Sequence, residues 1–177
     1  MRKLPLIFTL VSFPALAAPA APESGPYASM AFLAGSCWKG DLPAQPGQGD
    51  VKQTDEHCFT WVYGGRFLRD RHVVHADNGR PDYVGETVYY WDAPKKQIEY
   101  LYFENQGGVS QGAVQPAADT LVFPATDYIE DGKPQTYRSH WQHAGSDAYD
   151  VVTEFKEDDG WKPAWTVRMK KTRAVSE

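Results

Sequence analysis

The amino-acid sequence predicts an all-β protein, an antiparallel meander β-barrel of about ten strands preceded by a short helical turn. Long helical periodicity is absent from the chain. Short runs rich in Val, Tyr, Trp, Phe and Thr follow one another instead, as is typical of β-strands. Turn sequences such as Asp77-Asn78-Gly79 separate these runs and supply the positive φ angles that tight hairpins need.

The first 17 residues have the pattern of a cleaved signal peptide. Arg2 and Lys3 form a short basic region, and the segment 4–17 is largely apolar but too short to span a membrane. Small residues at Ala15 and Ala17 suit a signal peptidase. We therefore expect an exported protein, periplasmic or secreted, without a membrane-spanning segment.

A single domain is expected over residues 27–177, after a flexible lead-in at 18–26 that is rich in Ala and Pro. Residues 27–33 are expected to form one helical turn, which Gly35 ends. The ten expected strands cover residues 36–42, 52–63, 66–76, 83–91, 96–104, 108–115, 119–126, 134–143, 147–156 and 161–172.

Closure into a barrel follows from the two edges that a ten-stranded meander would otherwise expose. Apolar residues occupy both faces of some strands: Tyr100 and Tyr102 point one way, Leu101 and Phe103 the other. This pattern suits a barrel whose interior holds a ligand or a core, and a barrel of this size leaves room for a small ligand. A two-sheet sandwich is the alternative.

The charge of the exported chain argues against a nucleic-acid partner. Removal of Arg2 and Lys3 reduces the 18 basic residues to 16, against 23 acidic ones, which gives a net charge of −7. An acidic surface repels phosphate backbones.

Cys37 and Cys58, the two cysteines of the chain, favour one disulfide in an exported protein. Closure of a loop of about 20 residues would contribute about 3 kcal/mol. The alternative is two free buried thiols, and two cysteines alone cannot complete a zinc site.

Several segments together resemble a bacterial secreted lipocalin-like family of unknown function. They are FLAGSCWKG, HCFTWVYGGRFLRDRHVV, GETVYYWD, YFENQGGVSQG and a final Thr-Arg after a basic strand. That family is similar to the calycin superfamily, which includes lipocalins, fatty-acid-binding proteins and nitrobindin-like heme proteins. The resemblance covers residues 28–173 and implies a meander barrel with a ligand cavity.

The resemblance also implies that Gly35, Trp38 and Arg173 close one end of the barrel. Gly35 would let the chain turn into the first strand, Trp38 would plug the end, and Arg173 would stack across the indole. Lipocalins place one residue between this Gly and Trp, whereas Ser36 and Cys37 separate them here. The likeness is therefore to the calycin architecture and not to lipocalins proper.

One expected strand is unusually charged. Arg69 and Arg71 share one of its faces and Asp70 and His72 share the other, so at least one polar set should enter the barrel or lie at its mouth. An interior Arg would need a carboxylate, either Glu86 of the next strand or one on a ligand. The alternative is a salt-bridge ladder on the surface.

The predicted function is the binding of a small hydrophobic or amphipathic ligand inside the barrel, by a monomer or homodimer. The alternatives are an envelope structural or interaction protein with a side-chain-filled barrel, and an enzyme that uses the pocket, although no nucleophile motif supports catalysis. The predicted ligand-binding residues are Trp61, Arg69, Arg71, Glu86, Tyr90, Tyr100, Tyr102 and Trp141.

Two His-x-x-His patterns, His72 with His75 and His140 with His143, fall on expected strands. Residues three apart on a strand face opposite sides of the sheet, so neither pair can ligate one ion. We therefore predict no metal and no cofactor. The alternative is heme bound through His140 or His143, because nitrobindin-like barrels bind heme through a His on a late strand.

Overall fold

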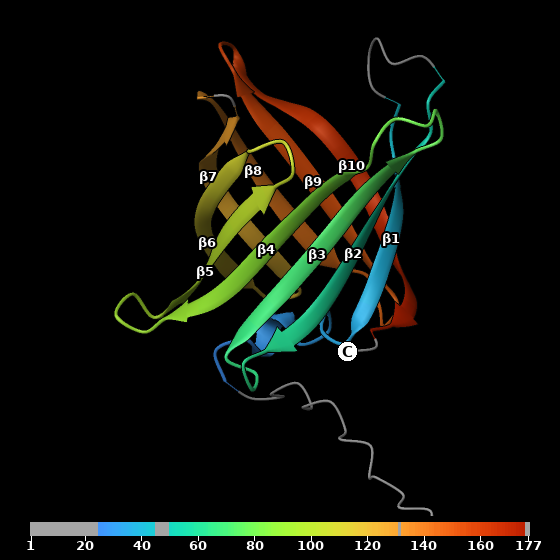
Figure 1. The fold of residues 1–177 in the computed structure, drawn as a ribbon. Helices are drawn as coiled ribbons and strands as arrows, with labels where there is room; N and C mark the ends of the chain where they lie inside the picture. Colours follow the sequence, from blue (N-terminus) through green and yellow to red (C-terminus); the bar gives the residue numbers. More distant parts are fainter. Residues whose placement is uncertain (1–24, 45–49, 131, 176–177) are drawn as a thin grey trace, which may run out of the picture.

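A closed barrel of ten antiparallel strands forms the described part of the protein (Figure 1). The structure, a computed structural model, describes residues 25–44, 50–130 and 132–175. Each strand pairs with the next along the chain, and β10 pairs with β1 to complete the ring. This arrangement confirms the predicted all-β meander barrel and excludes the sandwich. The predicted signal peptide and most of the lead-in lie outside the described residues.

Within these described ranges, no helix combines the length and the apolar character needed to cross a membrane. The elements are η1 (Ala28–Met30), β1 (Ser36–Leu42), β2 (Gln53–Val62), β3 (Phe67–Ala76), β4 (Tyr83–Asp92), β5 (Gln97–Glu104), β6 (Val109–Ala117), β7 (Thr120–Glu130), β8 (Lys133–His143), β9 (Ala148–Glu157) and β10 (Gly160–Ala174).

Strand β7 is longer than the predicted 119–126 because it continues past a register irregularity. Pro124 lies inside this strand, and the pairing of β7 with β8 shifts between Phe123 and Thr126. Proline has no N–H to donate to a neighbouring strand, so it is tolerated at such irregularities. Strand β10 shifts in the same way around Pro163.

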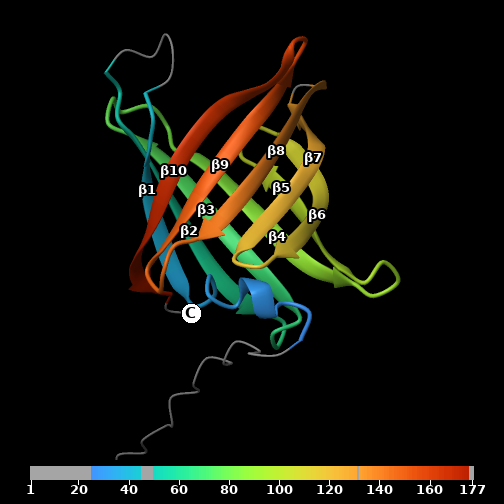
Figure 2. The ribbon, with the colours of Figure 1, turned by 180° about the vertical axis from the view of Figure 1, so that it is seen from behind.

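The segment that contains η1 closes one end of the barrel (Figures 1 and 2). Tyr27, Met30 and Leu33 are buried there. The hydroxyl of Tyr27 donates a hydrogen bond to the carbonyl oxygen of Arg66 at 2.8 Å, and Nε1 of Trp38 donates to the carbonyl oxygen of Leu33 at 3.1 Å. The short N-terminal helical turn predicted from the sequence is therefore present, and it lies against the indole of β1.

The predicted disulfide between Cys37 and Cys58 is also present. The two residues are direct partners in the β1–β2 pairing, with Cα atoms 4.0 Å apart. Just before β1, Gly35 adopts a φ of +70° and donates its N–H to the carbonyl oxygen of Phe59 at 2.8 Å. A residue with a Cβ rarely adopts this conformation, so glycine suits the turn into the first strand.

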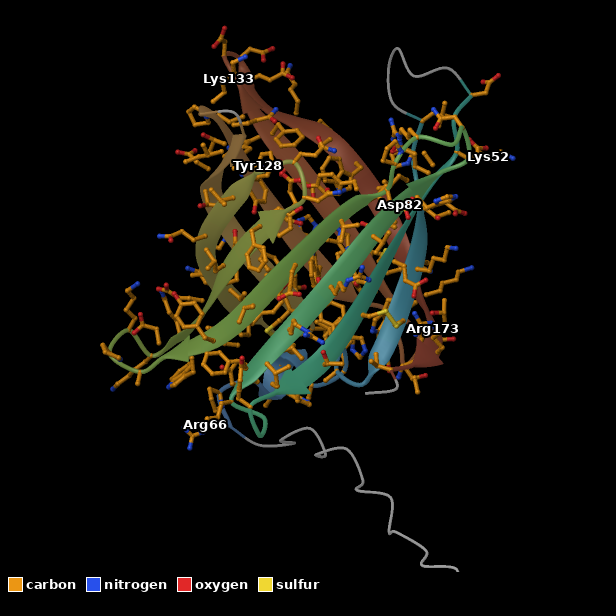
Figure 3. All side chains as sticks on the ribbon, viewed as in Figure 1. Lys52, Arg66, Asp82, Tyr128, Lys133 and Arg173 are labelled. Atoms are coloured by element: carbon orange, nitrogen blue, oxygen red, sulfur yellow. A yellow bond between two sulfur atoms is a disulfide. The ribbon has the colours of Figure 1, made fainter. Side chains whose placement is uncertain are left out.

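The cation over the Trp38 indole is Lys171, whose Nζ lies 5.3 Å from the ring centroid. Arg173, which the resemblance places over this ring, instead pairs with Glu56 at 2.5 Å on the outer surface beside β1 (Figure 3). Lys171 takes this place because the β1–β10 register shifts between Cys37 and Trp38. The shift sets Trp38 opposite Lys171 and Cys37 opposite Arg173.

Candidate functional site

The barrel encloses a cavity of about 630 Å³. Its lining extends to Gln106, in the β5–β6 turn at the end of the barrel opposite η1 (Figure 1). Tyr128, which also lines the cavity, lies toward that same end in Figure 3, far from Arg66 at the end beside η1. The cavity therefore extends toward the turns at the end opposite η1.

Aromatic rings form much of the cavity wall. The ring centroids of Trp141 and Phe123 are 4.7 Å apart, and those of Phe123 and Tyr100 are 5.8 Å apart. Phe155 and Trp165, from β9 and β10, line another part of the wall with their centroids 5.7 Å apart. These rings offer flat apolar surfaces to a ligand.

A cluster of four ionisable side chains lies on the part of the cavity wall that β2 and β3 form; we call it the Asp–His cluster. It consists of Asp55, His57, Asp70 and His72, all of which line the cavity. His57 lies between the two carboxylates: Nδ1 is 2.7 Å from Oδ2 of Asp70 and Nε2 is 3.0 Å from Oδ2 of Asp55. The other oxygen of Asp55 lies 3.2 Å from Nδ1 of His72.

The two carboxylates determine the protonation of His57. Burial alone would lower the pKa of His57, but the charges and hydrogen bonds of Asp55 and Asp70 outweigh burial and raise it well above its ordinary value. Burial acts to raise the pKa of Asp55. The charges and hydrogen bonds of His57 and His72 together outweigh burial, so the pKa of Asp55 falls below its usual range. At neutral pH, an imidazolium is therefore held between two carboxylates.

Tyrosine hydroxyls continue this polar wall. Nε2 of His72 lies 3.2 Å from the hydroxyl of Tyr102, which is 2.5 Å from the hydroxyl of Tyr83. Burial raises the pKa of both tyrosines, so both hydroxyls stay neutral. Each hydroxyl can donate a hydrogen bond to a molecule in the cavity or accept one from it.

Three of the predicted ligand-binding residues, Tyr100, Tyr102 and Trp141, line the cavity. Trp61 does not line it. This residue is buried against Tyr27 near the closed end, with ring centroids 5.4 Å apart. Ligand contact with the three lining residues stays a prediction.

Arg69, Arg71, Glu86 and Tyr90 lie on the outer face of the sheet, because their neighbours in sequence occupy the inner face. Arg71 borders an outer groove together with Glu56 and the disulfide sulfur of Cys58, and Tyr90 donates a hydrogen bond to Glu99 at 3.1 Å. Of the two polar sets on β3, the Asp70 and His72 set therefore enters the barrel. None of these four residues is among those that line the cavity.

Asp55 and His57 were not predicted as site residues, although the sequence holds a signal for them. Asp55 and His57 are two residues apart on β2, so their side chains share one face of the strand. The Gly64-Gly65 turn joins β2 to β3. Extension of the pairing from that turn places His57 directly opposite His72, as the structure shows. Alternation on each strand, combined with hairpin register, could have brought the cluster together.

The histidines of each His-x-x-His pattern point to different sides of the sheet, as predicted. His72 lines the cavity, whereas His75 is exposed and pairs with Asp82 at 2.7 Å. His140 is exposed, and His143 is half-buried with its ring centroid 4.4 Å from that of Phe32.

Searches of known protein families and of curated proteins find no match to the chain.

Proposed function

We propose that the protein is an exported, calycin-like barrel that binds one small, largely apolar ligand in its interior. The observation that carries this proposal is the cavity of about 630 Å³ inside a closed barrel. Pockets that enclose small organic molecules have volumes of about 300–1,000 Å³. The cavity has the size of a binding site for one such molecule.

The aromatic wall supports a ligand with a flat apolar part. Trp141 and Phe123 line the cavity as a tilted pair of rings, and Tyr100 and Trp165 extend the same lining. Apolar surface that a ligand buries here contributes about 25 cal/mol per Å² before the cost of association is subtracted. Binding affinity therefore comes mainly from burial of the ligand's apolar surface.

The polar groups of the cavity favour a neutral ligand with a hydroxyl or N–H donor over an anionic one. No Lys or Arg is among the described residues that line the cavity, whereas two carboxylates are. The charge of His57 is already shared between Asp55 and Asp70. Oδ1 of Asp70 is buried and has no hydrogen-bond partner among the described residues, so it can accept a hydrogen bond from a ligand.

Export is supported by the Cys37–Cys58 disulfide and by the signal-peptide pattern of residues 1–17. Disulfides persist in oxidising compartments such as the bacterial periplasm. The proposed location of the protein is therefore the periplasm or the medium.

Two fluorescent probes that share the same aromatic ring system but differ in charge test the proposal. N-phenylnaphthylamine is neutral and carries one N–H, and anilinonaphthalene sulfonate is its anionic analogue. We expect the neutral probe to bind with a stoichiometry of one and to bind at least tenfold more tightly than the sulfonate, measured by fluorescence titration. The titration uses chelator-treated, metal-free protein, in which the described lining residues include no Lys or Arg to pair with the sulfonate and the carboxylates of Asp55 and Asp70 repel it.

Two variants of β9 locate the probe. Val151 lines the cavity, and its sequence neighbour Val152 lies on the opposite face of the strand. Val151→Trp should fill part of the cavity and abolish binding, whereas Val152→Trp should leave it unchanged. Absence of binding to the unmodified protein, or equal binding to both variants, would favour the alternative of a barrel without a ligand.

A further inference from the structure

The Asp–His cluster has the composition of a metal site. We infer that Asp55, His57 and His72 bind one divalent transition-metal ion inside the barrel, with the coordination left open toward the cavity. The three residues each offer one ligand atom, and these atoms lie within 4.8 Å of one another. This inference does not depend on the proposed organic ligand, because it is based on the cluster alone.

The strand pairing fixes the three ligands on a rigid surface. His57 and His72 are direct partners in the β2–β3 pairing, and their ring centroids are 4.7 Å apart. Asp55 lies two residues before His57 and therefore faces the same side of β2. Sites built on strands hold their geometry better than sites built on loops.

Gly85 makes room for one of these ligands. It is the partner of His72 in the β3–β4 pairing. A Cβ at this position would overlap the imidazole of His72 and would lie 2.7 Å from Cε2 of Tyr102. The absence of a side chain on β4 is therefore what allows the His72 ring to stand beside Asp55.

The distances between donor atoms are close to those around a bound ion. A transition-metal ion with bonds of about 2.1 Å in tetrahedral geometry separates its ligand atoms by about 3.4 Å. Nε2 of His57 and Nδ1 of His72 lie 3.0 and 3.2 Å from the two oxygens of Asp55. The two rings are stacked with an interplanar angle of 28°, so side-chain rotations would have to turn both nitrogens toward one ion, which would displace the proton of His57 Nε2.

Both imidazoles have the outer partners that metal-binding histidines require. Nδ1 of His57 contacts Asp70, and Nε2 of His72 contacts the hydroxyl of Tyr102. Such partners fix which ring nitrogen is free to bind the metal, and here they leave His57 Nε2 and His72 Nδ1 toward Asp55. A histidine whose other ring nitrogen donates to a carboxylate, as His57 Nδ1 does to Asp70, is a recurrent form of this arrangement.

Charge balance supports a divalent ion. Once the ion has displaced the Nε2 proton of His57 and both imidazoles are neutral, Asp55 and Asp70 carry two negative charges, which one divalent cation compensates. Asp70 is 1 % exposed, and its Oδ1 has no hydrogen-bond partner within the described part of the chain. A water molecule on the metal ion would supply the donor that this buried oxygen lacks.

Two imidazole nitrogens and one carboxylate suit zinc and its first-row neighbours better than calcium or magnesium, which prefer oxygen ligands alone. Three protein ligands leave at least one position for water or a substrate atom, as in catalytic zinc sites. A second cluster, formed by Cys37, Glu56 and Cys58, offers no comparable site because both sulfurs are in the disulfide.

Zinc titration of the untagged protein tests this site. The protein is first treated with a chelator and then titrated with zinc in competition with pyridylazoresorcinol. We expect one zinc ion per chain, and binding weakened more than about 100-fold in both Asp55→Asn and His72→Gln, because each removes a ligand. Asp70→Asn should weaken binding by about 10- to 100-fold, since it removes only the outer partner of His57.

His75→Ala is the matched control, because His75 lies on β3 but is exposed outside the barrel. It should bind zinc like the unmodified protein. Circular dichroism shows whether each variant is folded, and the visible absorption of bound cobalt reports the same site independently. No zinc binding by the unmodified protein, undiminished binding by folded Asp55→Asn and His72→Gln, or an equal loss in His75→Ala would overturn the inference.

Discussion

The Cys37–Cys58 disulfide joins β1 to β2 beside the place where β10 closes the barrel. Replacement of both cysteines by alanine removes a cross-link between residues 21 positions apart. In the chain-entropy model, a loop of this length stabilises the folded state by about 3 kcal/mol, because it restricts the unfolded chain. The two residues are already neighbours in the sheet, so the folded strands do not need to rearrange.

Urea titration followed by tryptophan fluorescence measures this loss. With a slope of about 1–3 kcal/mol per molar urea, the midpoint of the double variant should fall by about 1–3 M. The unmodified protein should unfold at the same lowered midpoint once a reducing agent has opened the disulfide, whereas the double variant should not respond to that agent. A double variant within about 0.5 kcal/mol of the oxidised protein would refute the reasoning.

Three further predictions concern the closed end, the buried tyrosines and the strand beside the cluster. Trp38→Ala should lower the free energy of unfolding by about 3–5 kcal/mol in the same titration, because the indole is fully buried; a loss below about 1 kcal/mol would contradict its role in closing the barrel. Burial raises the pKa of Tyr89 and Tyr149 well above 10, so the folded state keeps both neutral while the unfolded chain ionises near pH 10. The free energy of unfolding should therefore fall above pH 10 by about 1.4 kcal/mol per pH unit for each of these two tyrosines. Tyrosinate absorbance from Tyr89 and Tyr149 should appear only when the protein unfolds, and such absorbance in the folded protein would contradict their burial. Gly85→Ala should displace the His72 ring, lower the free energy of unfolding by about 1–3 kcal/mol and weaken zinc binding at least tenfold. If the free energy of unfolding and the zinc affinity both stay unchanged, the ring does not need this space.

Local signals were sufficient to predict most of the fold. Turn residues such as Gly64-Gly65 mark hairpins, and strands joined by hairpins can only run antiparallel to one another. The disulfide could be predicted because the chain has two cysteines and begins with the pattern of an export signal. The end of β7 was missed, because the strand continues beyond Pro124 through a register shift that depends on its neighbours.

The candidate site could be predicted only in part, because it depends on which face of each strand turns inward. The sequence shows that Asp70 and His72 oppose Arg69 and Arg71, but both faces of β3 contain apolar residues as well. In the folded barrel, Asp70 and His72 line the cavity, and the register with β2 sets His57 on that same face opposite His72. The position of Lys171 over Trp38 likewise depends on a register shift that no short sequence pattern reveals.

The central claim is that the closed barrel holds a small molecule in its interior. Native mass spectrometry of the protein isolated from the cells that make it tests this claim most directly. We expect a mass that exceeds that of the polypeptide and any metal ion by one small organic molecule, and Val151→Trp from the same source should lack that excess while Val152→Trp keeps it. A protein whose mass is accounted for by polypeptide and metal alone would contradict the account.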